Sequence, residues 1–178
     1  MGINTIVFIP LLAAIWKILS GKNQQWKMEI KKIDKSESEL VIDLFDKYRV
    51  FYKQKTDLTL AKEFIEARLN NNESIIFVAI IENIPVGFTQ LYPKYSSVRT
   101  TQNWILNDLY VENKHRKQGI GEKLINAAMD FANRKGSKFV ELSTAVDNFT
   151  AQGLYEKIGF EKQAPETDFY TYRINVNW

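Results

Sequence analysis

The sequence of 178 residues contains no cysteine and a single histidine, His115. The absence of cysteine excludes disulfide bonds, thiolate metal sites and a covalent cysteine intermediate, and it makes a reducing, cytoplasmic location the default. One histidine also makes a histidine-rich metal site or a Ser-His-Asp relay hard to build. We therefore expect no metal, and any catalysis must use other side chains.

The sequence also lacks a large excess of either charge, because 24 basic and 21 acidic residues leave a net charge of only +3. This excess does not argue for a nucleic-acid partner, although it does not oppose an anionic cofactor. The composition, 45% hydrophobic and 25% charged, is that of an ordinary globular protein, and the length suits one domain.

A long hydrophobic run occurs at the N-terminus, over residues 3–19, where Asn4, Pro10 and Lys17 interrupt it. At roughly 17 residues it is at the lower edge of a membrane span, and it lacks the features of a secretory signal. We expect residues 1–27 to be an extension that packs on the domain 28–178 or on a second subunit. The alternatives are a membrane anchor that leaves the domain in the cytoplasm, and an extension outside the working protein.

The spacing of apolar residues predicts alternating strands and helices after this extension. The expected strands are 28–33, 74–81, 86–93, 104–111, 139–144 and 169–176. The expected helices are about 40–48, 59–69, 120–135 and 148–158. A capping box of Ser36 and Glu39 is expected before the first helix, Leu60 is expected on the inner face of the second, and 94–102 is expected as a hairpin loop. This order predicts a mixed sheet covered by helices.

The turn Arg116-Lys117-Gln118-Gly119-Ile120-Gly121, which we call the glycine turn, joins a predicted strand to a predicted helix. The first N–H groups of a helix have no partner within it and attract phosphate, and glycine lets the phosphate approach. Arg116 adds a guanidinium that can bind two oxygens of a pyrophosphate. The turn predicts a diphosphate cradle, with a plain helix start as the alternative for this motif alone. Its spacing fits neither a P-loop nor a dinucleotide fingerprint.

Context makes the motif more specific. The block LNDLYVENKHRKQGIGEKL, followed after one helix and one strand by NFTAQGLYEKIGF, resembles the GNAT superfamily of N-acetyltransferases, which use acetyl-CoA. The resemblance is strongest over residues 104–160, and residues 1–27 have no counterpart in it. It implies an α/β (α+β) fold of one domain, with a central, mixed, partly splayed sheet and helices on both faces. It also implies a homodimer, which is a habit of the family.

The same resemblance implies the residues that bind the cofactor. The strand before the glycine turn should carry a bulge, and the backbone of Leu109, Tyr110 and Val111 should pair with the pantetheine arm, with the Val111 N–H as oxyanion donor. The pyrophosphate should lie on the turn with Arg116 alongside, against the N–H groups of Lys117, Gln118, Gly119, Ile120 and Gly121. Asn148 should cap the later helix and touch the cofactor.

Tyr155 matches the family tyrosine that protonates the leaving thiolate, and a core tyrosine is the alternative. Asp108 is the nearest match to the general base of the family. Strand alternation predicts that Asp108 shares a face with Trp104, Leu106 and Tyr110 while Asn107 faces the other way. Some relatives carry an acid at the position of Asn107, so Glu141 and Asp147 stay as further candidates. Without cysteine, direct attack of an amine on the thioester is the economical route.

The acceptor pocket is expected between the first two helices and the hairpin. The residues offered there are Asp46, Tyr48, Phe51, Tyr52, Tyr92, Tyr95 and Trp104. Aromatic rings with an occasional acid suit a cationic amine. We therefore expect acetylation of a primary amine of a small, polyamine-like molecule. The alternatives are acetylation of a protein lysine or N-terminus, and a non-catalytic, CoA-binding regulatory module.

Overall fold

The structure is a computed structural model that describes residues 27–164 and 172–174. The strands of its sheet, in spatial order, are β1 (Met28–Lys32), β2 (Ile75–Ile81), β3 (Ile84–Ser96), β4 (Thr101–Val111) and β5 (Val140–Glu141). Strands β1 to β4 pair antiparallel, and β5 pairs parallel to β4. The mixed sheet expected from the sequence is confirmed.

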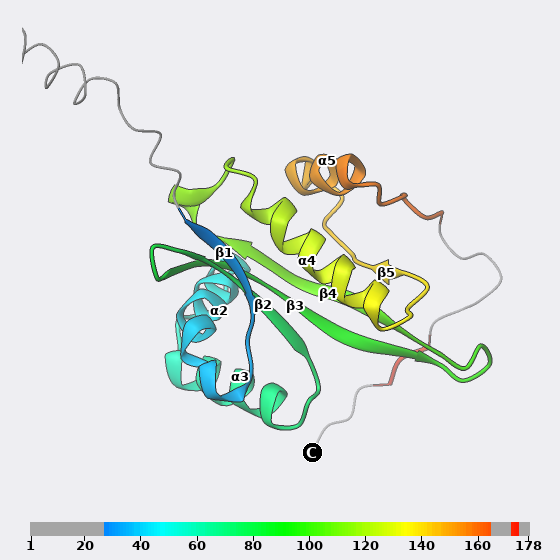
Figure 1. Ribbon diagram of the computed structural model, residues 1–178, viewed down its shortest axis with the longest axis horizontal. Helices are drawn as coiled ribbons and strands as arrows, with labels where there is room; N and C mark the ends of the chain where they lie inside the picture. Colours follow the sequence, from blue (N-terminus) through cyan, green and yellow to red (C-terminus); the bar gives the residue numbers. More distant parts are fainter. Residues whose placement is uncertain (1–26, 165–171, 175–178) are drawn as a thin grey trace, which may run out of the picture.

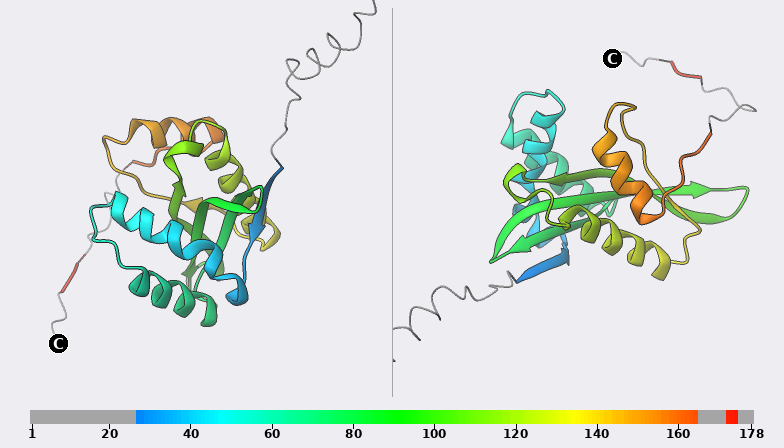
Figure 2. Two further views of the ribbon diagram at one scale, coloured as in Figure 1. Left: turned by 90° about the vertical axis from the view of Figure 1, so that its left-hand side faces the viewer. Right: turned by 90° about the horizontal axis from the view of Figure 1, so that it is seen from above.

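Helices cover both faces of the sheet (Figure 1). The helices are α2 (Glu39–Phe51), α3 (Leu58–Asn70), α4 (Ile120–Arg134) and α5 (Phe149–Ile158), with short 3-10 turns η1 (Lys35–Glu37) and η2 (Asn113–His115). Helices α2 and α3 lie on one face, and α4 and α5 on the other, as the left-hand view of Figure 2 also shows. Among the described residues, no helix has both the length and the apolar character needed to cross a membrane.

Strand β2 explains why its sequence is a continuous apolar run. Ile76 and Val78 belong to the core under α2 and α3, whereas Phe77 and Ala79 belong to the core under α4. A strand buried on both faces has no polar side to show. The same reasoning fits α4, whose predicted inner residues are all buried: Ile120, Leu124, Ile125, Ala128 and Ala132.

Two details in the N-terminal half differ from expectation, the capping box and the placement of Leu60. The capping box forms two residues earlier than predicted, because Asp34 accepts from the Ser36 N–H at 2.8 Å and Glu37 accepts from the Asp34 N–H at 3.4 Å. Ser38, at the N-cap of α2, makes no side-chain cap. Leu60 is 48% exposed, since the buried stripe of α3 runs one position further on, through Ala61, Ile65 and Leu69.

The hairpin is longer than predicted, because residues 94–96 and 101–103 pair as strand and only 97–100 form the loop. This part projects beyond the helices (Figures 1 and 2), so its polar composition reflects exposure and not the end of the strands. The predicted strand 139–144 is only Val140–Glu141. Of the predicted strand 169–176, residues 172–174 are described and form no strand, and the remainder lies outside the described residues. The extension 1–27 lies outside them except for residue 27.

Candidate active site

A bulge in β4 decides which way the predicted acid points. Gln90 pairs with Asp108 and Leu91 pairs with Leu106, so Asn107 is an extra residue on β4. Such an insertion reverses the alternation of the strand. Two expectations are therefore wrong: Leu106 packs in the core under α4 while Asp108 faces α2, and the Asn107 side chain reaches Asp108 instead of turning away. The expected common face of Asp108 and Tyr110 is confirmed, since Tyr110 packs on the α2 side.

Beyond this bulge, β4 leaves β5. The two strands pair only at Trp104 with Val140 and at Ile105 with Glu141. From residue 106 to residue 111 no described strand lies on the β5 side of β4, and we call this side the open edge. The partly splayed sheet expected from the sequence is thus present.

The register of the hairpin determines which backbone groups point into the open edge. The Glu112 N–H donates to the Val86 carbonyl at 2.9 Å, and antiparallel pairs alternate in their hydrogen bonding. The N–H groups of Leu109 and Val111 therefore point away from β3, into the open edge. The backbone of Tyr110 faces β3, where its carbonyl oxygen would be 2.7 Å from a Cβ atom at Gly87.

The glycine turn follows directly at the end of this edge. Lys117 and Gly119 both have left-handed backbone, with φ of 60° and 77°. Within the described chain the N–H groups of residues 117–119 make no backbone hydrogen bond, and the first N–H groups of α4 have no partner inside the helix. A Cβ atom at Gly121 would lie 3.4 Å from the Leu154 side chain, an ordinary van der Waals contact, so α5 packs beside α4 at this point. The turn offers a row of free donors at a helix N-terminus.

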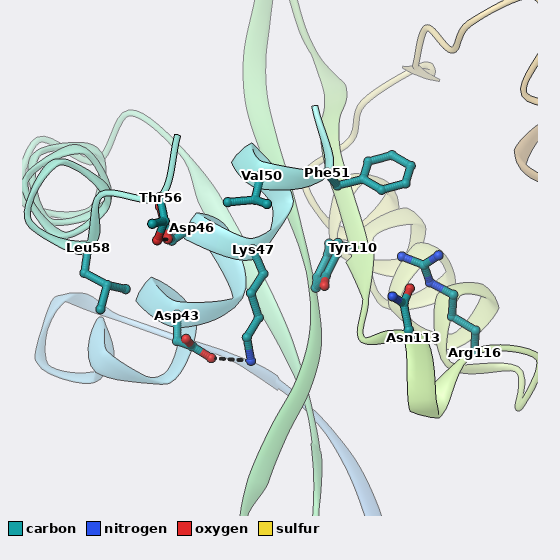
Figure 3. A pocket seen from close by; sticks show the side chains of 10 residues that line it. All are labelled: Asp43, Asp46, Lys47, Val50, Phe51, Thr56, Leu58, Tyr110, Asn113 and Arg116. Atoms are coloured by element: carbon teal, nitrogen blue, oxygen red, sulfur yellow. Dashed lines mark hydrogen bonds and ion pairs between the residues drawn. The ribbon is translucent and has the colours of Figure 1, made fainter. Parts of the chain in front are cut away.

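Arg116 closes the corner between this turn and α2. Its Nε donates to the Val111 carbonyl at 2.9 Å, and its guanidinium lies 5.6 Å from the Phe51 ring and 5.8 Å from the Tyr110 ring. Figure 3 shows these side chains around a hollow of about 490 Å³. On its α2 side, Lys47 pairs with Asp43 at 2.7 Å. Any contact of Arg116 with phosphate must come from this stacked position.

Asp108 is the buried acid of the site. It is 4% exposed, and burial raises its pKa, while hydrogen bonding from Tyr48 and from Asn107 partly offsets this rise. The Asn107 Nδ2 donates to its Oδ1 at 3.0 Å, and the Thr89 hydroxyl donates to its backbone carbonyl at 2.8 Å. A carboxylate with a raised pKa is a better base at neutral pH than an ordinary one.

Two tyrosines, Tyr48 and Tyr92, lie close enough to this acid to feel its charge, and Tyr52 and Tyr155 continue the cluster beyond Tyr48. Burial and the charge of Asp108 raise the pKa of Tyr48 in α2, and they raise the pKa of Tyr92 in β3 to about 12. The Tyr52 ring lies 5.0 Å from the Tyr48 ring. Burial, with a smaller effect of Tyr52, also raises the pKa of Tyr155 in α5. The phenols of Tyr48, Tyr92 and Tyr155 are therefore kept protonated and able to donate.

Three other residues predicted for the acceptor pocket have structural roles or lie away from Asp108, although Asp46 also lines the hollow near Arg116 (Figure 3). Asp46 is buried and accepts from Arg49 at 2.7 Å and from the Asp57 N–H at 2.9 Å, so it ties α2 to the α2–α3 loop. Tyr95 is 72% exposed on the projecting hairpin. The Trp104 ring packs against the Phe131 ring, with their centroids 5.1 Å apart, in the core on the face of the sheet opposite to Asp108.

The further acid candidates and the helix cap are also placed. Glu141 forms an ion pair with Lys94 at 2.6 Å, and Asp147 is exposed in the loop before α5. The Asn148 Oδ1 accepts from the Ala151 N–H at 3.3 Å, so its predicted role as N-cap is confirmed. Gly159, with φ of 108°, ends α5 as predicted.

Two polar residues of the site region were not predicted. Thr89 and Gln90 are both fully buried in β3, next to Asp108 across the sheet. The signal in the sequence is the pair Thr-Gln inside the apolar run VGFTQLYP, because buried polar residues in a two-sided strand need partners.

Comparison with known proteins identifies the class. The sequence model of the Acetyltransferase (GNAT) family matches residues 39–160, so the chain belongs to this family. The "Uncharacterized N-acetyltransferase YhfO" of Bacillus subtilis (strain 168) is 42% identical over 149 residues, which are 84% of this chain and 98% of that protein. The chain is therefore an N-acetyltransferase, and the non-catalytic alternative is set aside.

Solved structures share the fold. The crystal structure of a probable acetyltransferase has a TM-score of 0.75 and 34% identity, and the match covers 84% of this chain and 98% of that one. An aminoglycoside N-acetyltransferase in complex with CoA has a TM-score of 0.71 at 19% identity, covering 85% and 99% of the two chains. The single-domain GNAT-like fold expected from the sequence is confirmed.

Proposed function

We propose that this enzyme transfers the acetyl group of acetyl-CoA to a primary amine of a small molecule, by direct attack of the amine on the thioester. The observation that carries the proposal is Asp108, a buried carboxyl with a raised pKa. It lies on β4 beside the open edge, with protonated tyrosines around it. In this arrangement the Asp108 carboxylate can bind a cationic amine among aromatic rings and can then act as the base.

The chain has the groups that acetyl-CoA needs. The Leu109 and Val111 N–H groups on the open edge can hold the amides of the pantetheine arm as an added strand would. The free N–H groups from Lys117 to Gly121 suit the pyrophosphate, with Arg116 alongside. Asn148 keeps its proposed contact with the cofactor in addition to its capping bond. When bound, acetyl-CoA supplies the reactive thioester.

The residues then divide the reaction between them. An alkylammonium has a pKa of about 10 and must lose a proton before it can attack, and Asp108 accepts that proton. The Val111 N–H donates to the oxygen of the thioester as negative charge develops on it. The Tyr155 hydroxyl donates a proton to the sulfur as the C–S bond breaks. Of the two protons lost by the ammonium, one balances the thiol and one leaves to solvent.

The side chains around Asp108 support a small amine as the acceptor. Asp108 offers one negative charge, and the rings of Tyr48, Tyr52 and Tyr92 offer faces to a cation. The aminoglycoside enzyme of the same fold is named for an amine-bearing small molecule, which supports this class. A polyamine-like amine stays our preferred acceptor. A homodimer and a cytoplasmic location stay predictions.

The test is isothermal titration with acetyl-CoA, followed by thiol release with polyamines, aminoglycosides, amino acids and lysine peptides. We expect acetyl-CoA to bind and thiol release to follow with a small amine. Release with peptides alone would transfer the function to the protein-acetylating alternative. Absence of acetyl-CoA binding would overturn the proposal.

A further inference from the structure

The bulge in β4 brings two neighbouring side chains together. Asn107 is the extra residue, it is exposed, and its Nδ2 donates to the Asp108 Oδ1 at 3.0 Å. In an unbroken strand, successive side chains point to opposite faces and could not meet in this way. The carboxamide therefore lies at the rim of the site, between solvent and the buried acid.

We propose that Asn107 is a positioning residue that holds the Asp108 carboxyl ionised and oriented to receive the proton of the acceptor amine. This inference rests on the proposed function, in which Asp108 is the base. Asn107 itself transfers no proton.

The groups that face Asp108 explain why the Asn107 amide influences its ionisation. From α2 it faces Tyr48, and from β3 it faces Tyr92. Gln90, its partner across the sheet, donates its Nε2 to the Ser74 hydroxyl at 2.8 Å, and its buried Oε1 is an acceptor without a partner in the described structure. None of these facing groups is a cation.

Further out, Arg68 and Glu73 act on Tyr92, and neither contributes to the pKa of Asp108. Burial disfavours the carboxylate, so hydrogen-bond donors are what keep it charged. The donors that act on it are the Tyr48 hydroxyl and the Asn107 amide. The Asn107 amide is therefore expected to influence the pH at which the base becomes active.

The experiment is the pH dependence of kcat/KM for wild type, for Asp108→Asn and for three further variants, with the best amine of the panel. Asn107→Leu keeps the size and removes the donor, and Asn107→Asp keeps the shape and places a second carboxyl beside Asp108. Gln102→Leu is the matched control, because it makes the same chemical change on the same strand, in the projecting hairpin opposite Tyr95.

We expect the acid limb to move to higher pH in Asn107→Leu, with kcat/KM about tenfold lower on the acidic side and little changed on the plateau. This factor corresponds to one hydrogen bond to a charged group. Asn107→Asp should move the limb further, because two carboxyls at one site oppose ionisation. Gln102→Leu should keep the wild-type profile. A ¹³C NMR titration of the Asp108 carboxyl should follow the same order.

The outcomes separate the two claims. If Asp108→Asn retained the acid limb, the assignment of the base in the proposed function would be wrong. If Asp108→Asn removed the limb while both Asn107 variants kept it at the wild-type position, the inference about Asn107 would be wrong and the base would stand. A uniform loss at every pH, with an unmoved carboxyl titration, would make Asn107 merely structural and also overturn the inference.

Discussion

The Tyr48 side chain of α2 lies against the Asp108 carboxyl of β4, and each affects the protonation of the other. Burial and the charge of Asp108 raise the pKa of Tyr48, and hydrogen bonding from Tyr48 lowers the pKa of Asp108 against the effect of burial. The phenol therefore stays protonated throughout the working pH range, and the carboxyl is the group of this pair that titrates. An acid limb in the activity should report Asp108.

Removing that carboxyl should stop proton transfer and leave the cofactor site intact. We expect Asp108→Asn to lower kcat/KM for the amine by about 10²–10⁴-fold, the usual contribution of a general base. Acetyl-CoA affinity by titration should change little, because the free N–H groups of the glycine turn are untouched. Asp147→Asn, an exposed acid before α5, is the control, and equal losses in both variants would contradict the assignment.

Asp108→Asn should raise the stability of the fold at neutral pH, although it lowers the activity. The folded-state pKa of Asp108 is raised, so its protonated form is favoured by folding, and this contribution is lost as pH rises through the folded pKa. Asp108→Asn should therefore gain stability relative to wild type at pH 7 and lose this advantage near about pH 3, below ordinary carboxyl pKa values. Urea unfolding at both pH values measures the difference. A constant difference would show that ionisation of Asp108 is not the cause.

Tyr155 should affect the departure of the thiolate and not the binding of acetyl-CoA. We expect Tyr155→Phe to keep the packing on Phe160, whose ring lies 5.9 Å away, and to lower kcat by about 10²-fold or more. Stopped-flow thiol release measures this step. Tyr95→Phe, which removes an exposed hydroxyl from the hairpin, should be silent. A Tyr155→Phe enzyme with wild-type kcat would return Tyr155 to the role of a core residue.

Gly119 should be needed for its backbone conformation. At φ of 77° an alanine is strained by roughly 1–2 kcal/mol, although no atom lies within 4 Å of the added Cβ. Gly119→Ala should lower stability by about that amount and weaken acetyl-CoA binding.

The matched control for this substitution is Gly153→Ala inside α5, where the space is also open and φ is not positive. It should gain about 0.5–1 kcal/mol from helix propensity. Equal effects at both glycines in thermal unfolding would refute the conformational explanation.

The order of elements and the family resemblance were enough to predict the mixed, partly splayed sheet, and the finer details that were predicted correctly are local ones. The inner face of α4, the Asn148 cap and the Gly159 stop each depend on residues within a few positions of one another. The face of Asp108 was missed because it depends on the register between β3 and β4, which places the bulge at Asn107. Side chains of a regular strand alternate with a period of two, and the sequence of one strand does not reveal where a bulge inserts an extra residue relative to its partner.

Contacts between segments that lie far apart in the chain could not be predicted from the sequence either. The stacking of Arg116 on Phe51 joins residues 65 positions apart, and the buried tie made by Asp46 depends on how the α2–α3 loop folds back. Arg116 and Asp46 were both expected in the site because they are charged. Their packing against distant segments determines what each of them contacts. The meeting of Tyr48 with Asp108 depends in the same way on α2 lying across β4.

The most direct measurement of the central claim is detection by mass spectrometry of an acetylated small amine after incubation with acetyl-CoA, using wild type and Asp108→Asn in parallel. We predict that wild type produces a mono-acetylated primary amine with stoichiometric thiol release, and that the variant produces about 10²-fold less or lower still at equal acetyl-CoA occupancy. Equal product from both enzymes, or acetylation of lysine peptides alone, would contradict the account.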